Sequence, residues 1–224
     1  MIVPSDPDYV ETKLVKHGRH VLAPLFKDLA GWISTRSPGT SVLNIYCDKV
    51  ASTTEIVLPR LSVIFEWESE VSTFRAADGM NYDRLKQAAV AAKLEELLNG
   101  RHEQPFDTKH LLVIFCAFEP VARLEAIWRV RPEQLTQLQN ELNNPEIWKI
   151  RSDFGGLVVF LHTDVPLKRL EDELKTKCSN AFARIMNAYD EFGYFRKQPA
   201  QVTFDSKENF EKSYEGNWFY YDRR

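Results

Sequence analysis

The sequence predicts an α+β protein, with a mixed or antiparallel sheet and helices packed on it. Apolar residues recur at helical spacing in some stretches and alternate, or form short apolar runs, in others. In residues 122–205 these stretches follow the order strand, helix, strand, strand, helix, strand, which is the ferredoxin-like βαββαβ order. No Pro/Gly/Ser-rich linker separates the halves, so we expect a single domain over 1–224, with 1–120 and 121–224 as the alternative division.

The first half is predicted to begin with a helical stretch over 9–35, where apolar side chains recur every three or four residues. Gly18 and Pro24 divide this stretch, because an interior proline removes a backbone hydrogen bond and clashes with the preceding turn. Two strands, 42–48 and 61–68, follow and are expected to pair as a hairpin with a long loop.

A second helix is predicted over 82–98, where apolar side chains share one face and Gly100 provides a stop. The run 111–118 is apolar at both parities, which is typical of a central strand covered on both faces. Residues 124–130 alternate between mostly apolar and mostly charged side chains. That alternation predicts a strand with one face in water.

The second half continues with a short helix from Pro132, two strands joined by a tight turn, a long helix and one more strand. The strands and the long helix are expected at 147–151, 157–162, 166–192 and 201–204. The turn between the first two strands ends at Gly156, and glycine supplies the positive φ that such a turn needs. Asp205 with Glu208 has the spacing of a capping box and predicts a last helical turn, ended by Gly216.

The composition is that of a globular protein: of 224 residues, 44% are hydrophobic and 27% are charged, with a formal net charge of −3. This charge argues against a protein whose main task is to coat nucleic acid, because such proteins carry a basic face. An aromatic content of 12% excludes the disordered and collagen-like classes. No internal repeat is detected in the sequence.

The cysteines predict a reducing compartment. Cys47, Cys116 and Cys178 are an odd and dispersed set, which indicates buried thiols rather than a disulfide framework. The N-terminus has acids and prolines where a secretory signal has a basic start and an apolar run. The longest apolar run, 111–118, is far shorter than the roughly 20 residues that cross a bilayer. We therefore expect a cytoplasmic protein with no membrane anchor.

Three glutamates, Glu66, Glu68 and Glu70, alternate at the end of one predicted strand. Their carboxylates would point to the same side and form an acidic strip that Asp48 of the neighbouring strand joins. Clustered carboxylates can hold a divalent cation and activate water, so one alternative is a metal-dependent phosphodiesterase or nuclease using Asp48, Glu66 and Glu68. The plainer interpretation is a charged strand edge in solvent. The third is a strip that binds a partner protein.

Four aromatic residues stand in a row at 218–221 near the C-terminus. A strand buries only one parity against its own sheet, so the other pair needs cover from a helix or from a partner chain. Trp and Tyr dominate the hot spots of protein interfaces. Trp218 and Tyr220 are therefore predicted to contact a partner.

A basic sheet face is a further alternative, and it would make the chain a nucleic-acid-binding regulator. Its members would be Arg123, Arg129, Lys149 and Arg151. Sheets that bind RNA interleave aromatic side chains with the cations, whereas the neighbours of the same parity here are acidic or aliphatic. Nucleic acid is therefore not the expected partner.

No catalytic motif occurs with the spacing that its chemistry requires, so we predict no catalytic residue, no metal site and no cofactor. The prediction is a non-enzymatic cytoplasmic protein that binds another protein, as bacterial immunity proteins, inhibitors and adaptors do. The predicted contact residues are Glu66, Glu68, Glu70, Trp218 and Tyr220.

Overall fold

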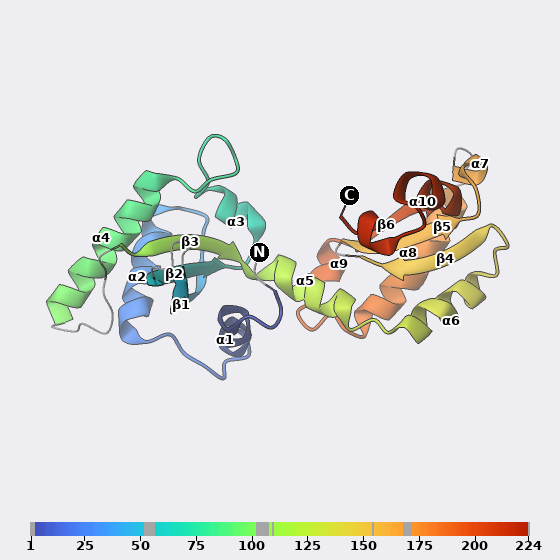
Figure 1. Cartoon of the computed structure of the whole chain (residues 1–224). Helices are drawn as coiled ribbons and strands as arrows, with labels where there is room; N and C mark the ends of the chain where they lie inside the picture. The colour runs from blue at the N-terminus through green and yellow to red at the C-terminus, as the bar shows by residue number, and fades with distance from the viewer. Residues whose placement is uncertain are drawn as a thin grey trace. The chain divides into compact units, whose positions relative to one another are not determined.

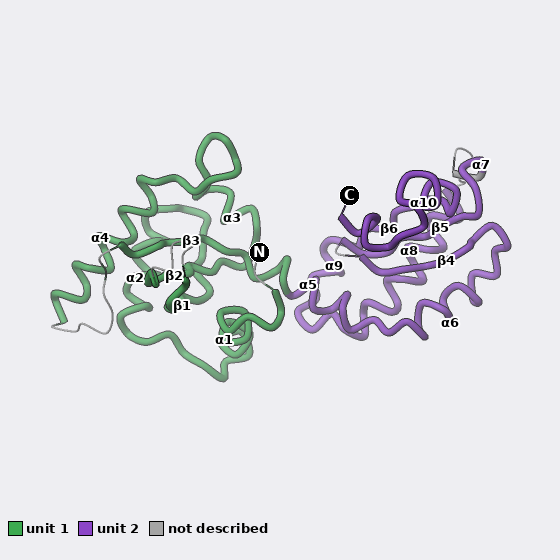
Figure 2. The backbone as a smooth tube through the Cα atoms, in the orientation of Figure 1, with its two compact units in different colours: residues 1–121 green, residues 122–224 purple. Residues whose placement is uncertain are grey.

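The computed structural model describes residues 3–51, 57–101, 108, 110–153, 155–167 and 172–223. The chain divides into two compact units, residues 1–121 and 122–224 (Figure 2). Each unit contains one three-stranded sheet. The boundary between the units falls inside helix α5 (Phe118–Trp128).

The first unit begins with two helices, followed by a strand hairpin, two further helices and a third strand. These are α1 (Pro7–Lys16), α2 (Pro24–Arg36), β1 (Val42–Ala51), β2 (Val57–Phe65), α3 (Glu68–Ser72), α4 (Arg84–Arg101) and β3 (Leu112–Ala117). Pro24 starts α2, a position where the missing N–H of proline has no helical partner to lose. Strand β2 pairs antiparallel with β1 and parallel with β3, so β2 is the central strand.

The two faces of the first sheet are covered differently. On one face, side chains of α2 and α4 such as Leu29 and Leu94 pack on Leu61 and Phe65 of β2, and all four are fully buried. The other face carries α1, which packs against β1 through a polar contact. There the Asn44 side chain donates a 3.0 Å hydrogen bond to the Thr12 hydroxyl, and both residues are buried.

The second unit repeats the order of a helix, a hairpin, a helical connection and a third strand. Its elements after α5 are α6 (Pro132–Leu142), β4 (Ile147–Ser152), β5 (Gly156–Leu161), α7 (Asp164–Leu167), α8 (Asp172–Asn187), α9 (Tyr194–Lys197), β6 (Gln201–Ser206), α10 (Lys207–Tyr214) and α11 (Trp218–Tyr221). Strand β5 pairs antiparallel with β4 and parallel with β6. The two units therefore share strand order and direction, although the sequence shows no repeat.

Every residue of β5 is buried, because helices cover both faces of the second sheet. Leu157, Val159 and Leu161 face a core with side chains of α6 and α8. Val158 and Phe160 face a smaller cluster with side chains of α10 and α11. Figure 1 shows α8 and α10 on opposite sides of this sheet.

The predicted α+β class is confirmed, with about 50% helix and 22% strand. The strand predicted at 124–130 is wrong, because these residues belong to α5 and the turn that ends it. Ile127, expected on a wet strand face, is 2% exposed, whereas Trp128, expected inside, is 52% exposed. The burial follows a helical period, and the ferredoxin-like order is therefore not confirmed.

Two further predictions need correction. The apolar run 111–118 contains β3, which lies at an edge of its sheet as far as the described residues show, while the fully buried central strand of the second unit is β5. The helix predicted over 166–192 is α7 and α8, which ends at Asn187; residues 168–171 lie outside the described residues. The single folding domain over 1–224 stays a prediction, since compactness does not measure independent folding. Among the described residues, no helix is both long and apolar enough to span a bilayer.

Candidate partner-binding site

The three predicted acidic residues do not alternate along a strand. Strand β2 ends at Phe65, and Glu68 and Glu70 lie in α3. Glu70 caps the N-terminus of this helix, because its Oε2 accepts a 2.9 Å hydrogen bond from the backbone N–H of Trp67, the N-cap residue. Its Oε1 accepts a 2.8 Å bond from the N–H of Ser41. A glutamate three residues after the N-cap is a sequence signal for this arrangement.

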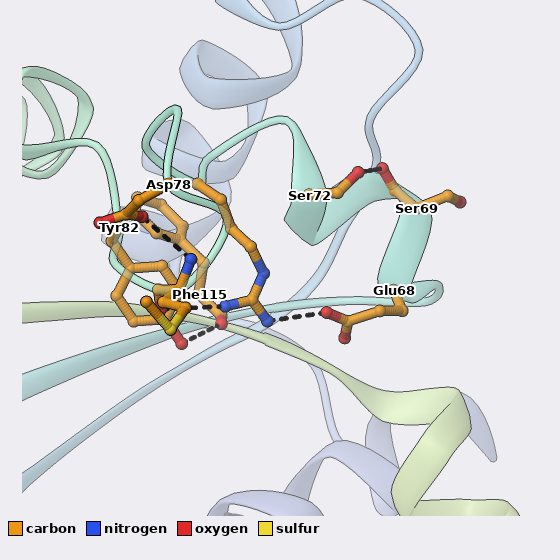
Figure 3. A network of polar contacts seen from close by, with 8 residues as sticks. Glu68, Ser69, Ser72, Asp78, Tyr82 and Phe115 are labelled. Atoms are coloured by element: carbon orange, nitrogen blue, oxygen red, sulfur yellow. Dashed lines mark hydrogen bonds and ion pairs between the residues drawn. The ribbon is translucent and has the colours of Figure 1, made fainter.

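The other two carboxylates have separate cationic partners. Lys16 of α1 donates to both carboxylate oxygens of Glu66, at 2.6 and 2.7 Å. Arg75 donates a 2.8 Å bond to Glu68, and Figure 3 shows this carboxylate turned toward the segment that carries Asp78 and Tyr82. The glutamates therefore form no continuous acidic strip. Among the three, only Glu68 exposes more than half of its side chain, at 53%.

The carboxylates of the nuclease alternative are likewise held by three different cations. Asp48 of β1 accepts two hydrogen bonds from Arg60 of β2, at 2.8 and 2.5 Å. This hydrogen bonding raises the pKa of the Arg60 guanidinium. In the part of the chain that the structure describes, no three His, Cys, Asp or Glu residues form a group that could hold a metal ion.

The basic sheet face of the third alternative does not form, because Arg123 and Arg129 do not lie on a strand. Arg123 belongs to α5, donates a 2.7 Å bond to the carbonyl oxygen of Gln198 and stacks 4.4 Å from the Phe195 ring centroid. Arg129 follows α5 and pairs with Glu125 at 2.7 Å. Only the remaining two cations, on β4, share a strand.

The C-terminal aromatic residues form a helical turn, not a strand. Residues three apart lie on the same face of a helix, so α11 separates the four aromatic residues into an inner and an outer pair. Trp218 and Tyr221 pack on the sheet, whereas Phe219 and Tyr220 are 55% and 50% exposed. In a strand, Trp218 and Tyr220 would lie on the same face. In the helical turn, Trp218 belongs to the inner pair and Tyr220 to the outer pair.

Trp218 anchors α11 on the second unit. Its ring stacks on Phe210 of α10 with centroids 4.0 Å apart. The guanidinium of Arg151 from β4 lies 4.0 Å from the Trp218 ring centroid, within the range of a cation–π contact. The same guanidinium holds both carboxylate oxygens of Asp222, each at 3.2 Å. The planar fork of one arginine therefore fixes both ends of the turn.

Tyr221 provides the second anchor. Its hydroxyl donates a 2.6 Å hydrogen bond to Oδ2 of Asp205 on β6, and its ring contacts Phe160 with centroids 5.1 Å apart. Oδ1 of Asp205 accepts from the backbone N–H of Ser206 at 2.7 Å. Ser206 is also the N-cap of α10, one residue later than the capping box predicted. Strand, helix and C-terminal turn are thus joined by a single carboxylate.

A pocket of about 430 Å³ opens beside these residues. Its lining is Asp153, Gly155, Gly156, Leu157, Gln201, Thr203, Phe204, Asp205 and Tyr221. Sequence reasoning missed this site, although polar residues at alternate positions of the last predicted strand, with exposed Gln201 and Thr203 among them, are the signal of an open strand. No protein-family model, curated protein or solved structure matches this chain.

Proposed function

We propose that this chain is a non-enzymatic, cytoplasmic protein-binding module of the immunity, inhibitor or adaptor type, and that α11 carries its contact surface. The observation that supports this most is the outer pair Phe219 and Tyr220. Both side chains are at least half exposed, and their rings lie 5.9 Å apart. Arg223 stacks 3.8 Å from the Phe219 ring centroid and adds a third residue.

The composition of this surface suits a protein interface. Aromatic residues and arginine are enriched at interfaces, and hot spots favour Trp, Tyr and Arg. Phenylalanine and tyrosine also have few rotatable bonds, so ordering them on binding costs little conformational entropy. Two adjacent aromatic rings and a guanidinium on one turn therefore offer a large contact area for a small loss of side-chain freedom.

The support under this surface favours binding as well. The helical turn is held by the Trp218 stack, by the Arg151 fork and by the bond from Tyr221 to Asp205. An interface anchor that is already fixed in its bound geometry avoids part of the cost of association. Glu66 and Glu70 are not included in the proposed surface, because each carboxylate is engaged inside its own unit.

Site-specific photo-crosslinking in the native host tests the proposal. A crosslinking amino acid at Tyr220 is expected to give an adduct of discrete mass with one protein, and replacement of Phe219 and Arg223 by alanine is expected to weaken it. The matched control is the same amino acid at Met80, which is 81% exposed and lies in the first unit. The proposal fails if Tyr220 gives no adduct, or if both positions give the same one.

A further inference from the structure

The pocket in the second unit lies along the edge of its sheet. In the described part of the chain, β6 is one of two edge strands, because its sheet has the order β4-β5-β6. Thr203 and Asp205 of β6 pair with Val158 and Phe160 of β5, so they lie on the same face of the sheet as Tyr221, and all three line the pocket. The pocket therefore lies over the α11 face of the sheet and reaches the edge strand β6.

An edge strand presents backbone N–H and C=O groups to which another extended chain can pair. Peptides bind in this way by adding a strand, with main-chain hydrogen bonds for affinity and pockets for alternate side chains. Thr203 is exposed in the middle of β6.

The charge of the pocket selects the side chain that enters it. Two carboxylates, Asp153 and Asp205, line it, and among the described residues no lysine or arginine belongs to its lining. Hydrogen bonds fix both carboxylates: Asp153 accepts from the N–H groups of Gly155 and Gly156, each at 3.0 Å, and Asp205 accepts from Tyr221. Fixed charges of one sign in a concave site attract the opposite charge.

The pocket is also lined by Tyr221, whose hydroxyl is bonded to Asp205. The pocket volume of about 430 Å³ is within the range of sites that enclose small-molecule ligands, so one long side chain has room. We propose that β6 binds an extended basic segment of the partner protein as an added strand, with a lysine or arginine side chain in this pocket. The inference rests on the proposed function and defines the partner's chemistry.

Direct titration tests this proposal on the full chain. The probe is a fluorescein-labelled octapeptide of alternating threonine and lysine, followed by fluorescence polarisation, and the comparison peptide has glutamate in place of lysine. The lysine peptide is expected to bind, with an affinity that falls as salt is added, and the glutamate peptide is expected not to bind. Equal binding of both peptides, or no binding of either, would overturn the proposal.

Substitutions of opposite charge at one exposed position separate charge from folding. Thr203→Lys is expected to weaken lysine-peptide binding by about tenfold or more, whereas Thr203→Glu is expected to strengthen it. Thr136→Lys on α6 is the matched control, since Thr136 is also exposed, and is expected to change little. A similar loss in both Thr203 variants would contradict the role of charge.

Hydrogen exchange reports the added strand itself. With the lysine peptide bound, amides of β6 are expected to gain protection. Those of β3, an edge strand of the first unit among the described residues, are expected to stay unchanged. Binding without protection of β6 would refute strand addition. If Tyr220 forms an adduct but the lysine peptide does not bind, strand addition is overturned and the proposed function is not. If Tyr220 forms no adduct, the proposed function itself is overturned.

Discussion

Gly156 is the residue whose replacement tests the architecture of the second sheet most directly. It pairs with Gln201 at the start of the parallel ladder between β5 and β6. A Cβ atom at Gly156 would lie 2.2 Å from the carbonyl oxygen of Gln201 and 3.0 Å from its nitrogen. Close carbon–oxygen contacts between strands settle near 3.3 Å, so an alanine here must displace β6 by about 1 Å.

The cost follows from what this displacement breaks. Overpacking against backbone costs about 1–3 kcal/mol, and one weakened ladder hydrogen bond adds about 1 kcal/mol. Gly156→Ala is therefore expected to lower the free energy of unfolding by about 2–4 kcal/mol. Gly155→Ala is the control, because the nearest described atoms to a Cβ there are two side-chain oxygens, at 3.7 and 3.8 Å. Its effect is expected to stay within about 1 kcal/mol.

Urea unfolding followed by tryptophan fluorescence measures this difference, since Trp148 and Trp218 both belong to the aromatic cluster over β5. With a slope of about 2 kcal/mol per molar urea, the midpoint is expected to fall by about 1–2 M for Gly156→Ala and by less than about 0.5 M for Gly155→Ala. Equal midpoints for the two variants would show that β5 and β6 do not approach as described.

Burial of titratable groups supplies the remaining predictions. Burial raises the pKa of Asp8, so the stability that its protonated form provides is present at low pH and is lost as pH rises through the raised value. Asp8→Asn, which keeps an acceptor for the N–H of Tyr9, is therefore expected to unfold at higher urea than the wild type near pH 7, with no such gain near pH 3; a loss near pH 7 would refute it. Burial also raises the pKa of Cys47 and Cys116 to about 12 and that of Cys178 to about 11. Alkylation by iodoacetamide near pH 8, followed by mass spectrometry, is expected to be about a hundredfold slower in the native than in the urea-unfolded chain, and equal rates would contradict this.

The elements that sequence could predict are those whose hydrophobic period is unambiguous. The helix at α4 and the hairpin of β4 and β5 were expected close to their observed bounds. The strand prediction at 124–130 was wrong because the short alternation there also fits a helix in which Leu124 and Ile127 are both buried. Periodicity over so few residues does not separate the two structures.

The candidate site depended on pairings that lie far apart in the chain. Among the four aromatic residues at 218–221, Trp218 and Tyr220 were predicted to contact a partner. In a helical turn, however, Trp218 packs on the sheet and Phe219 is exposed beside Tyr220. The pocket requires β5 to lie beside β6. Gly156 and Gln201 pair there, although α7, α8 and α9 separate the two strands in the sequence. No local pattern specifies that pairing, which is set by how the connecting helices cover the sheet.

The two units share one strand order, and the difference between them lies in what covers the second face of the sheet. In the first unit that face carries α1 and buries Asp8, Thr12 and Asn44, whose side chains need hydrogen-bond partners within the fold. In the second unit the corresponding face carries α10 and α11, whose aromatic side chains pack on the sheet. The guanidinium of Arg151 lies over Trp218, and the hydroxyl of Tyr221 is bonded to Asp205. Because packing requires only the inner pair of α11, its outer pair is left to face solvent. The surface that we propose for partner binding therefore belongs to the unit whose second sheet face is covered by aromatic side chains.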